Sequence, residues 1–192
     1  VHSMNCEYTF GNMFLWRDAY KTEVAKYDDF VICRWNTDCG YNYSLPLGEG
    51  DFKAAVSEII ANAGENGCVA QIYGVTESYK AVLDSDFDDK FTYTYDSGNY
   101  DYIYNVEDLA NLSGKKYHSK RNHITNFKKN NPDWSFEIID SDNIDECIKL
   151  HTEWIYNKED NDNETDYSLE FHAVLNGFEN YDKIGFLGGL IR

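Results

Sequence analysis

The densest group of side chains suited to binding chemistry lies between Leu109 and Pro132. This stretch contains no Asp or Glu and holds six cations: Lys115, Lys116, Lys120, Arg121, Lys128 and Lys129. The whole chain carries a formal charge of -17, so the residues outside the stretch carry -23. Because the acidic residues alone would keep the protein soluble, a compact basic segment on an acidic chain indicates a local site for an anion.

Arg121 and Lys120 are the members of this segment best suited to a phosphate or carboxylate group. Arg121 offers a planar fork of N–H donors, and Lys120 offers a point charge beside it. Lys116 and His123 extend the candidate ligand site, because an imidazole serves as a base or as a donor to an anion. The alternative is that the cations pair with surrounding acids and that His123, like His118, is a solvated helix residue.

A second candidate residue, Arg17, belongs to the segment CEYTFGNMFLWRDAY near the start of the chain. It follows Trp16 and lies close to Asn12. An arginine beside aromatic rings either stacks on them or anchors an element end. We include Arg17 in the candidate ligand site and keep structural support as the alternative.

The elements that position the basic residues follow from periodicity. At 100° per residue, Tyr117, Ile124 and Phe127 fall on one stripe of a helix over 115–130, and Pro132 ends it. Lys120, Arg121 and Lys128 fall on the stripe or at its edge. Cations at such a border either extend to water or line a cleft.

The run YIYNVEDLANLSGKKYHSKRNHITNFKK and the earlier CEYTFGNMFLWRDAY resemble the two signatures of the bacterial DUF2156 family. That family is related to the C-terminal domain of phosphatidylglycerol lysyltransferases. The resemblance implies an α/β (α+β) fold with a GNAT-like mixed sheet flanked by helices. It implies a first lobe over 1–131, including the basic linking helix 115–130, and the opening half of a second lobe over 132–192.

The same resemblance implies transfer of an acyl or aminoacyl group to an amine or hydroxyl acceptor. For a full-length parent the donor would be acyl-coenzyme A or aminoacyl-tRNA. We expect no cofactor in this chain and no activity from it alone, since the strand, Gly-rich loop and helix that hold a donor would follow Arg192. Gly185, Gly188 and Gly189 do not supply such a loop, because no helix follows them. The competing interpretation is a non-catalytic module whose basic helix binds an anionic ligand or an acidic partner.

Elsewhere the patterns predict alternating helices and strands. Helices are expected over 8–20, 52–63, 76–83, 106–112, 144–157 and 167–178, with Thr9 and Asp51 as caps and a loop over 158–166. Strands are expected over 30–35, 41–45, 68–73, 91–95, 100–104, 134–139 and 184–191.

Composition excludes several classes of protein. No run of 18 apolar residues and no signal peptide is present, so we expect a cytoplasmic protein without a membrane span. Five cysteines without metal-ligand spacing indicate reduced thiols and no metal site. The acidic charge argues against extended nucleic-acid binding but allows an anionic small molecule, an acyl donor or an RNA end. The apolar strand 184–191 predicts self-association or a complementing fragment.

Overall fold

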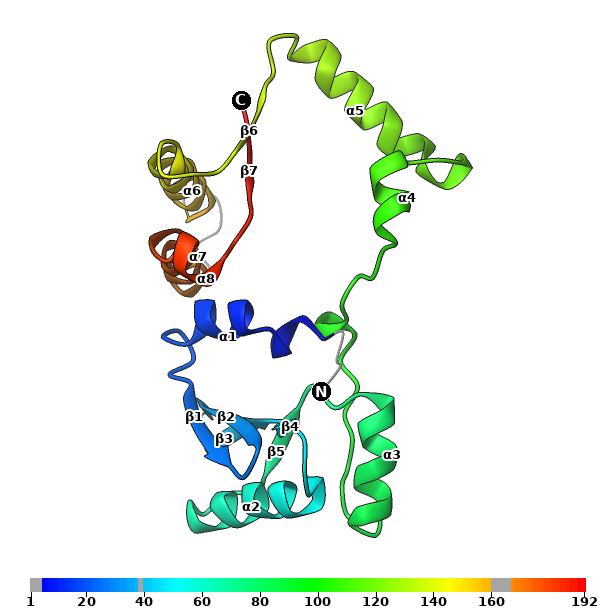
Figure 1. Ribbon diagram of the computed structural model, residues 1–192, viewed down its shortest axis with the longest axis vertical. Helices are drawn as coiled ribbons and strands as arrows, with labels where there is room; N and C mark the ends of the chain where they lie inside the picture. The colour runs from blue at the N-terminus through cyan, green and yellow to red at the C-terminus, as the bar shows by residue number, and fades with distance from the viewer. Residues whose placement is uncertain (1–4, 38–39, 160–166) are drawn as a thin grey trace. The chain divides into compact units, whose positions relative to one another are not determined.

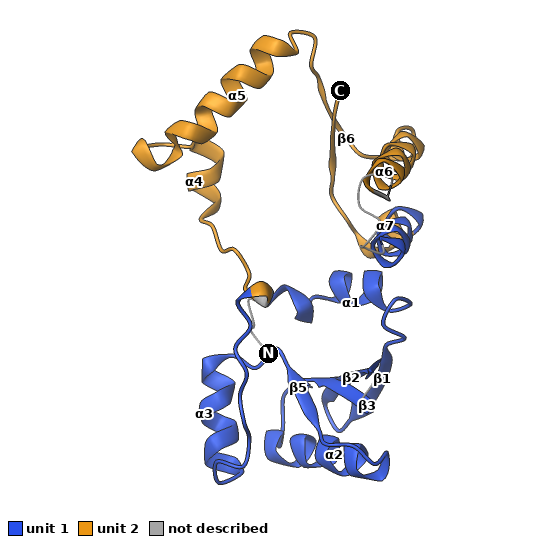
Figure 2. Ribbon diagram, turned by 180° about the vertical axis from the view of Figure 1, so that it is seen from behind, with its two compact units in different colours: residues 1–97, 163–179 blue, residues 98–162, 180–192 orange. Residues whose placement is uncertain are grey.

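The computed structural model describes residues 5–37, 40–159 and 167–192. The chain divides into two compact units, residues 1–97 with 163–179 and residues 98–162 with 180–192 (Figure 2). These units differ from the lobes expected from the family resemblance, because residues 98–131 group with the C-terminal elements. The lobe boundary therefore stays a prediction.

Unit 1 is built on a mixed five-stranded sheet (Figure 1). Its strands are β1 (Glu23–Tyr27), β2 (Phe30–Thr37), β3 (Gly40–Ser44), β4 (Leu47–Gly48) and β5 (Gln71–Tyr73). The order is β1-β2-β3-β5, with β4 beside β2. All pairs are antiparallel except β3 with β5. A parallel pair needs a crossover, and α2 (Phe52–Glu65) supplies it.

Helix α2 covers one face of this sheet. Asp51 caps it as predicted, accepting a hydrogen bond from the Ala54 N–H at 2.9 Å. The buried residues Ile32 and Tyr43 of the sheet pack with Ile59 and Ala63 of the helix. This core fixes the register of the strands, because a slip of one residue would turn the apolar side chains to the other face.

The remaining helices of unit 1 are short. They are α1 (Phe10–Trp16), α3 (Glu77–Asp86) and α7 (Ser168–Glu179), with a 3-10 turn at Cys6–Tyr8. A further 3-10 turn, Ser97–Asn99, contains the point along the chain where unit 1 ends and unit 2 begins. Thr9 caps α1 by accepting from the Asn12 N–H, as its position predicted. Helix α1 meets the sheet face opposite α2, where the Cys33 thiol lies 3.6 Å from the Met13 sulfur.

Unit 2 pairs a small sheet with helices. It contains α4 (Val106–Asn111), the 3-10 turn Lys115–Tyr117, α5 (His118–Asn130), β6 (Phe136–Ile138), α6 (Ile144–Glu159), α8 (Tyr181–Ile184) and β7 (Gly189–Ile191). Strands β6 and β7 are antiparallel. Leu190 is buried, and Arg192 ties the strand pair to α6 through ion pairs with Glu137 and Glu146 at 3.1 and 2.6 Å.

Two predicted strands, 91–95 and 100–104, are wrong. Both segments lack strand structure, although their aromatic and polar residues alternate. Among the residues that the structure describes, no strand pairs with either segment, and alternation without a partner strand is insufficient. Tyr93 is instead held by a side chain, since its hydroxyl donates to Asp84 Oδ1 at 2.7 Å.

The predicted strand 184–191 is wrong over its first half. Ile184 ends α8, and Gly185 follows with φ +69°, a left-handed conformation that terminates helices. Only Gly189–Ile191 forms a strand. Leu187 and Ile191 are exposed, as expected for apolar side chains that a partner would cover. That a partner binds at this strand stays a prediction.

In the part of the chain that the structure describes, every helix is too short or too polar to cross a membrane. Within those same residues, no three His, Cys, Asp or Glu side chains gather in a way that would hold a metal ion.

Candidate functional site

The basic segment forms a helix, as its periodicity predicted. It starts with the 3-10 turn Lys115–Tyr117 and continues as α5 to Asn130. Gly114, with φ +85°, separates it from α4. Lys128 and Lys129 lie in the last turn, where cations interact favourably with the helix dipole. None of the α5 side chains is buried.

Lys116 is engaged by an acid of the preceding helix. Its Nζ lies 2.8 Å from Asp108 Oδ2, and the Tyr117 hydroxyl lies 3.5 Å from the same oxygen. The hydrogen bond from Lys116 lowers the pKa of Asp108, and the same bond raises the pKa of Lys116. This pair matches the alternative interpretation, in which cations of the segment pair with neighbouring acids.

Arg121 holds the loop between α4 and α5. Its Nη1 donates to the carbonyl oxygens of Leu112 and Gly114, the second at 2.9 Å. Leu112 has φ +48°, a conformation that costs energy for a residue with a side chain. Because a charged donor makes strong hydrogen bonds to carbonyls, Arg121 stabilises this turn.

Lys120 and His123 are exposed on α5 and lie one helical turn apart. The stripe predicted from the sequence is exposed as well, since Ile124 and Phe127 are 45% and 40% exposed. Lys128 lies over the Trp134 ring at 5.0 Å. Helix α5 thus presents a surface that is both basic and apolar.

Arg17 lies at the end of α1 and belongs to unit 1, whereas α5 belongs to unit 2. Its Nη1 donates to the Phe14 carbonyl at 2.6 Å, and the guanidinium lies 4.0 Å from the Phe14 ring centroid. Its Nη2 reaches Asp18 at 3.2 Å and Asn176 of α7 at 3.4 Å. These contacts fit the structural support that we kept as the alternative.

The same N-terminal segment holds the sheet through Tyr8. The β3–β5 ladder ends at the pair Ser44 and Tyr73. At that point the Tyr8 hydroxyl donates to the Tyr73 carbonyl at 2.8 Å and accepts from the Leu45 N–H at 3.4 Å. Burial raises the pKa of the Tyr8 hydroxyl above its ordinary value. Tyr8 therefore satisfies backbone groups that the strands leave unpaired.

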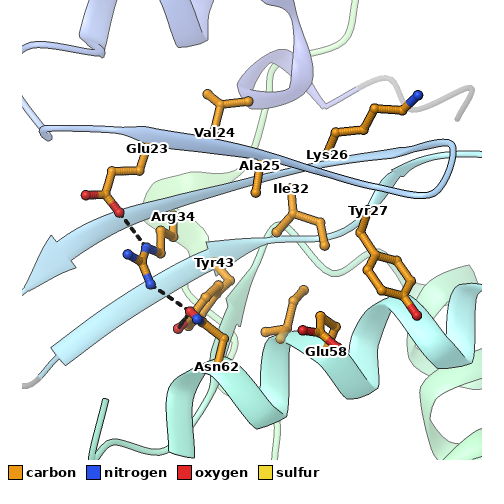
Figure 3. A pocket seen from close by; sticks show the side chains of 11 residues that line it. Glu23, Val24, Ala25, Lys26, Tyr27, Ile32, Arg34, Tyr43, Glu58 and Asn62 are labelled. Atoms are coloured by element: carbon orange, nitrogen blue, oxygen red, sulfur yellow. Dashed lines mark hydrogen bonds and ion pairs between the residues drawn. The ribbon is translucent and has the colours of Figure 1, made fainter. Parts of the chain in front are cut away.

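Unit 1 also contains a cavity of about 490 Å³ between the sheet and α2 (Figure 3). It is lined by Glu23, Val24, Ala25, Lys26 and Tyr27 of β1, Ile32 and Arg34 of β2, Tyr43 of β3, and Glu58, Ile59 and Asn62 of α2. Its volume lies within the range of small-molecule sites. No residue of α5 lines it.

A hydrogen-bonded group closes one side of the cavity. Arg34 donates from Nε to Glu23 at 2.6 Å and from Nη1 to Asn62 Oδ1 at 2.7 Å. The Tyr43 hydroxyl donates to the same oxygen at 3.0 Å. The hydrogen bond that Arg34 donates to Glu23 raises the pKa of Arg34, and burial raises the pKa of Tyr43. Arg34 also lies over the Tyr41 ring at 4.2 Å.

Sequence reasoning missed this cavity, because it did not predict β1. The cavity depends on register: Glu23, Ala25 and Tyr27 face the same side as their partners Arg34, Ile32 and Phe30. The alternation of Glu23, Ala25 and Tyr27 is the signal that was available, although a short edge strand with polar residues gives a weak one.

A family model described as phosphatidylglycerol lysyltransferase, C-terminal, matches residues 1–192. A crystal structure of a conserved protein of unknown function from Bacteroides thetaiotaomicron VPI-5482 has 32% sequence identity and a TM-score of 0.93. The match covers 100% of this chain and 64% of that one, so this chain spans less than two thirds of its length. A search of curated proteins found no match.

The fold is therefore that of a mixed α/β protein, a mixed sheet flanked by helices. Because the family model spans every residue, the chain belongs to the phosphatidylglycerol lysyltransferase C-terminal family.

Proposed function

We propose that this chain is a GNAT-like acyl- or aminoacyltransferase module in which α5 holds the phosphate-bearing part of the donor. Family membership supports the class of reaction, transfer to an amine or hydroxyl acceptor. The role of the protein in such a transfer is chiefly to position the donor and to stabilise charge. Coenzyme A thioesters and aminoacyl-tRNA both carry phosphate groups, which is the chemistry that a basic helix recognises.

The proposal rests on the positive charges of α5 that no neighbouring acid of the described chain neutralises. Lys116 pairs with Asp108, and Arg121 holds the α4–α5 loop. Among the described residues, Lys120, Lys128 and Lys129 have no ion-pair partner, although the chain as a whole is strongly acidic. Three exposed cations on one helix would attract phosphate, and acids elsewhere on the chain would repel it.

A non-catalytic module remains the second candidate. It is favoured by the exposed apolar side chains of α5, Ile124 and Phe127, because a surface that mixes apolar and basic groups also suits an acidic protein partner. We also propose a cytoplasmic location. Cys6, Cys33, Cys68 and Cys147 are free thiols, which suits a reducing compartment.

Single substitutions at neighbouring positions separate binding from folding. Lys120→Ala is expected to weaken binding of inorganic pyrophosphate, and of an RNA hairpin with a CCA 3′ end, about two- to fivefold without changing the melting temperature. Arg121→Ala is expected to lower the free energy of unfolding by about 1–2 kcal/mol, because two carbonyl groups lose their donor. Calorimetry and thermal unfolding measure both effects.

Lys149→Ala is the matched control, because Lys149 is an exposed helix lysine of α6 in the same unit. It should leave the binding of both probes unchanged. Equal losses from Lys120→Ala and Lys149→Ala would contradict the proposal, since general electrostatics would then explain them. Loss of pyrophosphate binding alone would point to a small donor, and loss of hairpin binding alone to an RNA-linked one.

A further inference from the structure

Among the residues that the structure describes, the cavity of unit 1 exposes one charged group without an ion-pair partner, the carboxylate of Glu58, to a bound small molecule. The Glu23 carboxylate is neutralised by Arg34 at 2.6 Å. Val24 and Lys26 border the cavity from β1, but their side chains point away from α2 (Figure 3). Glu58 is exposed on α2 and has no ion-pair partner among the described residues. The charge facing the cavity is therefore negative.

The two sides of the cavity differ in chemistry. Figure 3 shows Tyr27 and Glu58 on one side, Arg34 and Asn62 on the other, and Ala25 and Ile32 between them. Ala25 pairs with Ile32 in the β1–β2 ladder, and its methyl group is too small to fill the space above α2. The middle of the cavity is consequently apolar, lined by Ile32 of β2 and Ile59 of α2.

We propose that this cavity binds a primary aliphatic amine, with the alkyl chain over Ala25, Ile32 and Ile59 and the ammonium group between Glu58 and Tyr27. A carboxylate and an aromatic ring together form a site for a cation, the first by charge and the second by its π face. Ala25, Ile32 and Ile59 supply the apolar contact that a short alkyl chain requires. An acidic protein also raises the local concentration of cations.

Other head groups on the same alkyl chain fit this cavity less well than an ammonium group. A carboxylate would face the free Glu58 and would have to displace Glu23 from Arg34. An alcohol would keep the apolar contact but lose the charge. Pentylamine, pentanol and pentanoate share a five-carbon chain and differ in the head group, so together they test the assignment of the cation site.

Titration of the isotope-labelled full chain, followed by backbone amide NMR, measures this binding. Pentylamine is expected to give saturable shifts around Ala25, Ile32 and Ile59, with pentanol and pentanoate at least fivefold weaker. Ala25→Leu fills the middle of the cavity and should abolish the shifts. Glu58→Gln should weaken pentylamine binding about fivefold, whereas Glu65→Gln, at the exposed end of α2, should not.

The outcomes that overturn the proposal are distinct. Pentylamine binding that survives Ala25→Leu would place the ligand elsewhere. Equal binding of pentylamine and pentanol, or equal effects of Glu58→Gln and Glu65→Gln, would remove the role of the carboxylate. Absence of saturable shifts in the wild-type chain would also refute it. If Ala25→Leu fails to fold, as judged by its melting temperature, the two glutamate variants decide the question.

Discussion

Replacing Lys120 and Lys128 together by Glu is expected to lower the affinity of the chain for a CCA-ended RNA hairpin by at least tenfold. Both residues lie on the stripe that α5 exposes, so the double variant changes the charge of this surface by four units. Because the variant would contact about two fewer phosphates, its binding would release fewer counterions. The slope of log K against log salt concentration should therefore fall in magnitude by about two.

The control for this variant is Lys90→Glu with Lys149→Glu. Both lysines are exposed, at 76% and 78% of their side chains, and lie outside α5, so the net charge change is identical. Fluorescence anisotropy at several salt concentrations compares the two double variants. Similar losses in both would show that the hairpin responds to overall charge, and the assignment of the anion site to α5 would be wrong.

Gly74→Ala is expected to destabilise unit 1 by about 3 kcal/mol. Gly74 has φ +70°, where alanine costs about 1–2 kcal/mol, and an added methyl group would overlap the Tyr8 hydroxyl and lie 2.8 Å from its ring carbon Cζ. Tyr8 would have to leave the Tyr73 carbonyl and the Leu45 N–H, which costs roughly another 1–2 kcal/mol. Thermal unfolding should show a melting temperature lower by about 6–12 °C.

Gly67→Ala supplies the matched control. Gly67 has φ +72°, nearly the same backbone strain, but nothing lies within 4 Å of the added methyl group. The stability difference between the two variants therefore isolates the Tyr8 contact, and Tyr8→Phe should reproduce that difference. Identical losses for Gly74→Ala and Gly67→Ala would show that Tyr8 does not hold the end of the β3–β5 ladder.

Local signals predicted the helices α1 to α7, whereas α8 was not predicted. Asp51 caps α2 as expected, because capping and helical periodicity both act within a few residues. The basic helix was predicted for the same reason, and α5 lies within the expected range 115–130. Its candidate residues Lys116 and Arg121 have partners that lie outside the helix, which periodicity does not reveal.

Strand formation depends on a partner strand, which local sequence patterns do not identify. The segment 91–95 alternates as a strand should, yet Tyr93 binds Asp84 and no strand forms. Strand β1 was missed, although it pairs with β2 over five residues. The cavity beside it arises from the small Ala25 opposite Ile32, a feature that exists only once the register is known.

Our proposed role for α5, the anion-binding surface of a transferase-family module, requires that phosphate groups contact this helix. Backbone amide NMR of the labelled chain, titrated with the CCA-ended hairpin and separately with pyrophosphate, tests it most directly. We expect saturable shifts concentrated in residues 118–130, weakened in the Lys120→Glu and Lys128→Glu double variant. Shifts confined to other elements, or shifts that persist unchanged in that variant, would contradict it.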